Sequence, residues 1–215
     1  KHDLLEATME TKEMYERRLF KVVDIHADKQ FECIQNDVPG THIEITAPDD
    51  HVHEAERSIR TMKNGCRSNI HGLPYKYMPK VMVVRLVAMV TRSLNQFPSE
   101  NGVSDVLSPL AIVTGKKMMD FKKIKGAFGD YVQVHETAEI TNTMAPRSVG
   151  GILLNMTPND SGYYEFMNLN TGKLIKRKRF TVLPITQQVV ERVEQIAKDQ
   201  GMKEIKNGCL NFEWN

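Results

Sequence analysis

The stretch Phe20-Lys21-Val22-Val23-Asp24-Ile25-His26-Ala27-Asp28 decides the fold of the first half of the chain. Its β-branched residues Val22, Val23 and Ile25 predict a buried strand from Phe20 to Ala27, which Asp28 ends. Before this strand, apolar residues recur at helical spacing from Leu4 to Leu19 without any Pro or Gly, and this pattern predicts a helix.

Three further elements extend this pattern. A turn at Val38-Pro39-Gly40 precedes a predicted short strand from His42 to Thr46. Pro48-Asp49-Asp50 begins a predicted helix that ends near His71, with an Asp as N-cap. Pro79 opens another helix that continues to about Asn95. The order helix, strand, strand, helix favours an α/β domain.

The second half of the chain has a different character. Ser108 to Gly115 predicts a compact helix, with Ser as N-cap, Pro at the first helical position and Gly just past the end. After Gly126, strand-like runs alternate with turns rich in Gly, Asn, Asp and Pro, which is typical of a small β-barrel. These runs are 130–135, 151–156, 163–169 and 174–183, with a hairpin signal at Asn168 to Gly172. We therefore expect domains at 1–125 and 126–184, then a helical extension at 185–215 whose helix covers Pro184 to Gln200.

The composition sets limits on the class of protein. With 215 residues, 40% of them hydrophobic and 26% charged, the chain suits one large domain or two small ones. The net charge of +2 does not by itself indicate nucleic acid, so the distribution of charge must carry that argument. Cys33, Cys66 and Cys209 lack metal-binding spacing, and the seven histidines form no metal pattern, which argues against a zinc site. No signal peptide or membrane-length apolar run is found, which predicts an intracellular protein, in the nucleus or cytoplasm, without a membrane partner.

Two acidic residues stand in settings that suit a divalent metal ion. Asp28 ends the predicted strand, and Glu56 lies on the predicted helix that follows the second strand. Hard cations such as Mg²⁺ take carboxylate oxygens, and such a site can serve phosphoryl chemistry on nucleic acid. In the simpler interpretation, which the spacing alone favours, Asp28 only ends a strand and Glu56 pairs with Arg60 on a solvated helix face.

Basic residues gather in three places. Arg60, Lys63 and Arg67 fall on the same stripe of the predicted helix as Glu56, where they can hold a phosphate backbone. A second cluster lies on a predicted barrel strand and a third precedes the barrel; for each cluster, a solvated surface without a partner stays the alternative. The second cluster is Lys176, Arg177, Lys178 and Arg179, and the third is Lys116, Lys117, Lys122, Lys123 and Lys125.

Several motifs follow one another along the chain in a recognisable order. His26 to Phe31 resembles the segment that carries the second catalytic Asp of retroelement integrases, and Ala47 to Arg60 resembles the helix that bears the catalytic Glu. Leu107 to Lys117 is similar to the "TP…GKKP" segment of copia-type elements, and Phe128 to His135 to the strand after it. Val149 to Pro184 resembles the SH3-like domain that follows the integrase core. The resemblance covers most of the chain, from about Leu4 to Met202.

The resemblance implies a fold and an activity. The fold would be α/β, a truncated RNase H-like integrase core followed by a small SH3-like β-barrel. Asp28 and Glu56 would be the second and third ligands of an Asp-Asp-Glu site for Mg²⁺ or Mn²⁺. Arg57, Arg60 and Lys63 would be DNA contacts, in a chain that joins element DNA ends to target DNA and can form homo-oligomers.

The chain also departs from the family pattern. It begins at about the first helix and without Met, so we expect a fragment that lacks the first catalytic Asp, its strands and the zinc-binding N-terminal module. Lys29 and Gln30 replace the usual small or acidic residues after the Asp, and the Asp-to-Glu interval is short. We therefore expect a retrotransposon integrase fragment that is inactive alone. The alternatives are a nucleic-acid-binding or structural module derived from a retroelement, without catalysis.

Overall fold

The computed structural model describes residues 1–46, 53–98, 102–115, 124–135, 144, 146–157 and 162–205. Their contacts divide the chain into two compact units, which are described separately. Unit 1 is Lys1–Met62 with Ser93–Met119, and unit 2 is Lys63–Arg92 with Asp120–Asn215. The predicted domain limits at 125 and 184 stay predictions, because a division by contacts does not define evolutionary domains.

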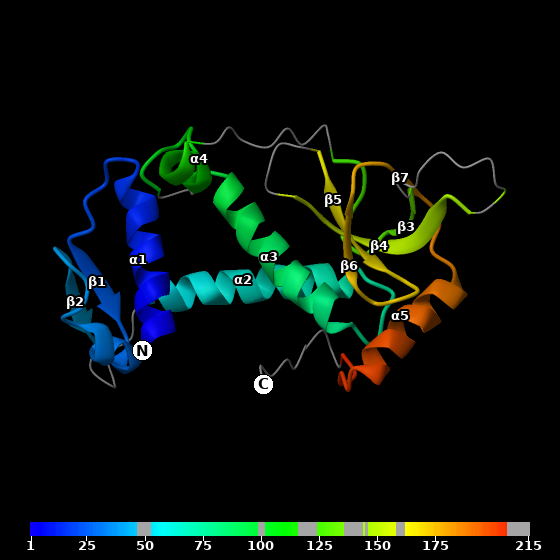
Figure 1. The fold of residues 1–215 in the computed structure, drawn as a ribbon, viewed down its shortest axis with the longest axis horizontal. Helices are drawn as coiled ribbons and strands as arrows, with labels where there is room; N and C mark the ends of the chain where they lie inside the picture. The colour runs from blue at the N-terminus through cyan, green and yellow to red at the C-terminus, as the bar shows by residue number, and fades with distance from the viewer. Residues whose placement is uncertain are drawn as a thin grey trace. The chain divides into compact units, whose positions relative to one another are not determined.

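Unit 1 is built on a short parallel pair of strands. β1 (Asp24–Ala27) pairs with β2 (His42–Ile45), and η1 (Lys29–Ile34), a 3-10 helix, connects them. Helix α1 (His2–Glu16) lies alongside the two strands (Figure 1). Its Leu4 and Leu5 contact a small core that consists of Ala27, Ile34, Val38 and Ile43.

The predicted strand from Phe20 to Ala27 is shorter in the structure. Only residues 24–27 are paired, while the side chains of Phe20 and Val23 are 43% and 52% exposed. Helix α1 ends at Glu16, and Leu19, three residues later, has a φ of 65°, a left-handed conformation that redirects the chain. The apolar run therefore marked a strand correctly but not its length, because a strand extends only where a partner strand accepts its hydrogen bonds.

The three helices that follow β2 agree with the sequence pattern. α2 (His53–His71) and α3 (Lys80–Gln96) match the two long predicted helices, and both contribute residues to each unit. The predicted N-cap of α2 at residues 48–50 lies outside the described residues. α4 (Pro109–Thr114) confirms its predicted caps: the Ser108 side chain accepts a hydrogen bond from the Ala111 N–H, and Gly115 is left-handed with a φ of 69°.

Unit 2 contains an antiparallel sheet in the order β6-β5-β4-β3-β7 (Figure 1). The predicted hairpin between β5 and β6 is confirmed, since the Gly172 N–H donates to the Asn168 carbonyl at 2.8 Å and Gly172 has a positive φ. The strands are β3 (Tyr131–His135), β4 (Ser148–Met156), β5 (Tyr164–Asn168), β6 (Leu174–Arg177) and β7 (Phe180–Val182).

The mixed α/β class is confirmed, but the predicted barrel is not closed in the described residues. The run 174–183 is two strands: β6 pairs with β5 at one end of the sheet, and β7 pairs with β3 at the other. Lys178 and Arg179 form the bend between them. Because β6 and β7 do not pair with each other, the sheet has two edges. The RNase H-like core is an expectation that the strands of unit 1 alone do not identify.

The two faces of the sheet have different neighbours. Val132, Val134, Leu153, Tyr164 and Phe166 form an apolar cluster on one face, in which the Phe166 and Phe180 rings meet edge to face at 5.1 Å. Alternation along β5 turns Glu165 and Met167 to the opposite face, and both are buried there. Buried residues thus occur on both faces of the same strand.

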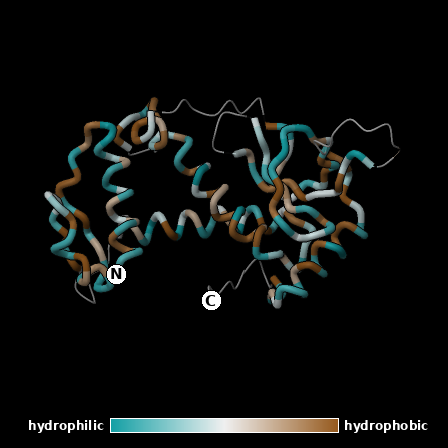
Figure 2. The backbone as a smooth tube through the Cα atoms, viewed as in Figure 1, coloured by the Kyte–Doolittle hydropathy of each residue, from teal (hydrophilic) through white to brown (hydrophobic). Residues whose placement is uncertain are grey.

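Helix α5 (Gln187–Asp199) is tied to an early part of the chain. It buries Val189, Val193, Ile196 and Ala197, and Figure 2 shows hydrophobic and hydrophilic residues alternating along it. The Lys76 N–H donates to Glu194 Oε1 and the Lys80 N–H to Gln200 Oε1, each at 2.8 Å. Within the described residues, no helix is long and apolar enough to span a membrane.

Tyr75 joins the same early segment to the sheet. Its hydroxyl donates to the Gly129 carbonyl at 2.9 Å. Burial, with a smaller contribution from Asp130, raises the pKa of Tyr75, so the phenol stays protonated and can donate this bond.

We expect Phe166→Ala to lower the free energy of unfolding by about 3–5 kcal/mol, because Phe166 is fully buried and its loss leaves a cavity. Ile185→Ala, at a side chain that is 38% exposed, should change it by about 0.5 kcal/mol or less. Urea unfolding followed by circular dichroism measures both. Equal effects would contradict the assignment of Phe166 to the core.

Candidate metal and nucleic-acid site

Asp28 directly follows β1 and caps the next helix. It is the N-cap residue of η1 with an extended backbone, and its Oδ1 accepts a hydrogen bond from the Gln30 N–H at 3.2 Å. Its Oδ2 accepts a second bond from Gln30 Nε2 at 2.7 Å. Both carboxylate oxygens thus have local partners, and a metal ion at Asp28 would replace at least one of them.

Glu56 lies in the first turns of α2 and is exposed. The carboxyl ends of the parallel strands β1 and β2 lie at one edge of their sheet. Asp28 follows β1 at that edge, and the chain continues from β2 to α2 at the same edge. Ligand sites of parallel sheets form at such an edge. The connecting residues 47–52 lie outside the described part of the chain. A metal site shared by Asp28 and Glu56 stays a prediction.

The described residues contain one group of three potential metal ligands in close proximity. His2, Asp3 and Glu6 meet in the first turn of α1, all of them exposed. The His2 Nδ1 lies 3.9 Å from Asp3 and 3.8 Å from Glu6. Exposed acidic side chains are common at the start of a helix. They interact favourably with the positive end of the helix dipole, and this interaction requires no metal ion.

The four predicted cations of α2 are all exposed. Arg60, Lys63 and Arg67 share a stripe with Glu56, as helical periodicity requires. The Arg67 Nη1 donates to Asn64 Oδ1 at 2.8 Å, which holds this guanidinium along the helix surface. Arg57 lies about a quarter-turn away from that stripe.

The second cluster, Lys176 to Arg179, does not form one face. In the strand register Lys176 lies opposite Glu165, whereas Arg177 lies opposite Tyr164. Arg177 Nη1 donates to the Lys176 carbonyl, and its buried Nε has no hydrogen-bond partner among the described residues. Lys178 and Arg179 are exposed at the bend after β6. The cluster therefore splits into positions with different surroundings.

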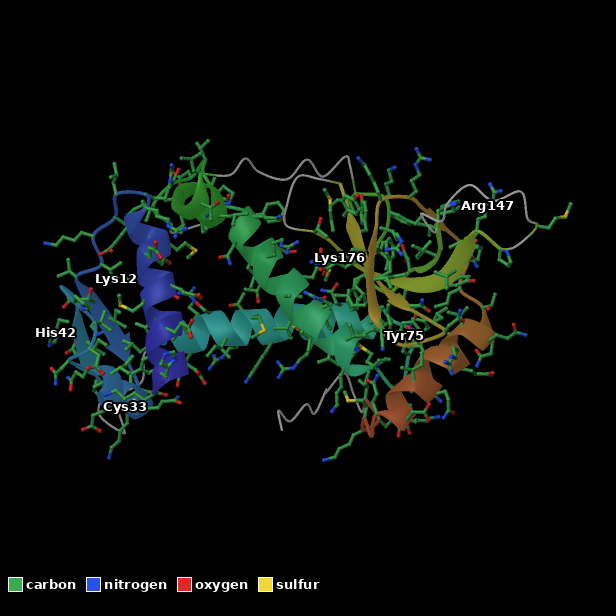
Figure 3. The ribbon with its side chains drawn as sticks, in the orientation of Figure 1. Lys12, Cys33, His42, Tyr75, Arg147 and Lys176 are labelled. Atoms are coloured by element: carbon green, nitrogen blue, oxygen red, sulfur yellow. The ribbon has the colours of Figure 1, made fainter. Side chains whose placement is uncertain are left out.

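Sequence reasoning missed the buried carboxylate of Glu165. Glu165 is 5% exposed. Its Oε2 lies 3.4 Å from Arg85 Nε on α3, and its Oε1 lies 3.5 Å from Lys176 Nζ on β6 (Lys176 is labelled in Figure 3). A lone Glu between Tyr164 and Phe166 in an apolar strand was the only signal for it in the sequence.

A cavity of about 510 Å³ lies in unit 1, beside α1, β1 and η1. Its walls are mainly apolar, and they include neither Asp28 nor Glu56. Lys12 reaches its rim, where its Nζ donates to the Pro39 carbonyl at 2.6 Å. The apolar lining is formed by Leu4, Ala7, Tyr15, Val22, Ile25 and Phe31. The cavity is therefore separate from the predicted metal ligands.

Comparison with known proteins does not assign this arrangement to a family. No protein-family model matches the chain, and no curated protein sequence matches it. The integrase resemblance therefore depends on the motif series in the sequence.

Two substitutions at Asp28 test its capping role. Asp28→Ala should lower the free energy of unfolding by about 1 kcal/mol, because the Gln30 N–H loses its acceptor. Asp28→Asn should change it by less than half as much, since Asn caps as well as Asp. Thermal unfolding of both variants measures the difference, and equal losses would contradict the capping role.

Proposed function

We propose that this chain binds DNA through its basic surfaces, as part of a copia-type retrotransposon integrase, and that residues 1–215 do not catalyse strand transfer by themselves. The observation that carries the proposal is the exposed stripe Arg60, Lys63 and Arg67 on α2. Exposed cations on one side of a helix can contact backbone phosphates.

Local contacts of the stripe support this interpretation. The Thr61 hydroxyl donates to the Arg57 carbonyl at 2.9 Å, so this polar side chain is satisfied within the helix, and Arg60, Lys63 and Arg67 are exposed beside it. Met62, Gly65 and Cys66 of the same helix are partly buried whereas the stripe is exposed, so α2 has one face for packing and one for solvent. The net charge of +2 is small, so binding would depend on this local arrangement and would be sensitive to salt.

The reason to propose no catalysis by residues 1–215 is chemical. The resemblance implies three carboxylates, and Asp28 and Glu56 supply two of them. Asp28 is also engaged by Gln30 through both oxygens and is followed by the cation Lys29. Each of these features weakens Mg²⁺ binding, which depends on negatively charged oxygen ligands.

A second candidate function is metal-dependent DNA strand transfer. One observation favours it. Asp28 lies at the carboxyl edge of the parallel strands β1 and β2, and β2 is followed in the chain by α2, which carries Glu56. Carboxylates at that edge can hold Mg²⁺ or Mn²⁺, which would activate a hydroxyl and stabilise the leaving oxygen. Asp28 and Glu56 would be the ligands.

We expect the double variant Arg60→Gln, Lys63→Gln to bind a labelled DNA duplex more weakly and with less dependence on salt. Removing two phosphate contacts should reduce the slope of log affinity against log salt by about 2. Fluorescence anisotropy over a salt series measures this slope.

The matched control is Arg17→Gln, Lys21→Gln, which removes the same charge from exposed positions outside the stripe. It should change the slope little. An equal loss in the two double variants would show a general charge effect and refute the α2 surface. No binding by the unaltered chain at low salt would refute DNA binding altogether.

Catalysis is tested by strand transfer with a pre-processed DNA end and Mg²⁺ or Mn²⁺. We expect product at the level of the reaction without protein, because Gln30 engages both oxygens of Asp28 and Lys29 follows it, which weakens metal binding. Turnover that Glu56→Gln abolishes, with Glu54→Gln as the matched control on the same helix, would establish the second candidate in place of the first.

A further inference from the structure

The buried carboxylate of Glu165 organises a group of cations within unit 2. Arg85 contacts one carboxylate oxygen at 3.4 Å and Lys176 the other at 3.5 Å, so the two cations lie on either side of it. A third cation, Arg92, lies further along α3 than Arg85. Its Nη1 donates to the Met156 carbonyl at 2.6 Å. The helix and the β5–β6 hairpin together hold all four groups.

These cations exceed the negative charge beside them. One carboxylate faces three cations, and among the described residues no second carboxylate forms an ion pair with any of the three. Burial lowers the pKa of Arg92; Glu165 partly offsets this effect, and the repulsion of Arg85 adds to it. Counted over the described residues, the group therefore has more positive than negative charge in a partly desolvated position, where an anion is favoured.

The side chains of Arg85 and Lys176 are accessible to an anion from solvent, whereas that of Glu165 is buried. The side chains of Arg85 and Lys176 are 32% and 58% exposed, whereas that of Glu165 is 6% exposed. A guanidinium has five N–H donors, and Arg85 directs its Nε to Glu165, so the other donors can serve a second acceptor. Guanidinium donors match phosphate oxygens, and an ammonium adds a point charge beside them.

We propose that Arg85 and Lys176 together bind one backbone phosphate of DNA, with Glu165 as the buried residue that positions them. This inference rests on the proposed DNA binding and assigns to it a second contact surface, in unit 2. Lys176 acts here with a helix residue far away in sequence, and not with its neighbours Arg177 to Arg179.

The test uses the full chain and a fluorescein-labelled DNA duplex, with anisotropy measured from about 50 to about 200 mM salt. Arg85→Gln and Lys176→Gln should each reduce the slope of log affinity against log salt by about 1. The matched controls Lys80→Gln on α3 and Lys173→Gln beside β6 remove the same charge and should leave the slope unchanged.

A further variant separates binding from folding. Removing one partner of a buried carboxylate can destabilise the fold, whereas removing the charge of both can be tolerated. The double variant Glu165→Gln, Arg85→Gln should therefore stay folded by circular dichroism and still show the reduced slope. Glu165→Gln alone, where it stays folded, should weaken DNA binding, because Arg85 and Lys176 lose the carboxylate that positions them.

Folded variants of Arg85 and Lys176 with the unaltered slope would overturn the inference and leave an ion cluster with a structural role only, while DNA binding through α2 would stand. Absence of DNA binding by the unaltered chain at about 50 mM salt would overturn the proposed function and this inference together. The two failures are thus distinguishable.

Discussion

Burying the Glu165 carboxylate beneath α3 is the constraint on which unit 2 depends. A carboxylate that is 5% exposed cannot remain ionised at low cost unless cations replace the water it has lost. Arg85 and Lys176 supply that replacement from two elements that are far apart in the sequence, so the ion pairs help to specify the position of the helix on the hairpin. The bond from Arg92 to the Met156 carbonyl adds a second point of attachment to the same helix. Residues 63–92 belong to the sheet unit, although α2 begins and α3 ends in unit 1.

Elements with local signals could be predicted from the sequence, and those that depend on distant partners could not. The caps of α4 follow from Ser108, Pro109 and Gly115 alone, since each acts within a few residues of its own position. The hairpin at Asn168 to Gly172 is equally local. The closure of a barrel is different, because it depends on whether residues after Arg177 continue one strand or turn to another edge. Lys178 and Arg179 make that turn, and nothing in their immediate sequence indicates it.

The candidate site shows the same division. Asp28 is a residue type that binds metal ions, and it also stands where a helix cap is expected. The same few residues of sequence therefore predict two different roles. The structure gives the cap a definite geometry through Gln30, whereas a metal site shared with Glu56 stays a prediction from the motif series. The Glu165 group was missed for the opposite reason: its cations are distant in sequence, and a single acidic residue in a strand carries little information until its partners are known.

The attachment of α5 to the segment before α3 determines the order in which unit 2 can form during synthesis. The bonds from Lys76 to Glu194 and from Lys80 to Gln200 join positions 118 and 120 residues apart. A ribosome therefore completes and releases the first of these partners long before it has made the second. Until then, the apolar side of α3 and the backbone donors at its start lack their final neighbours, which favours slow completion and gives chaperones a period in which to bind. The contacts of α5 with residues 76 and 80 are therefore among the last of unit 2 for which both partners have been synthesised.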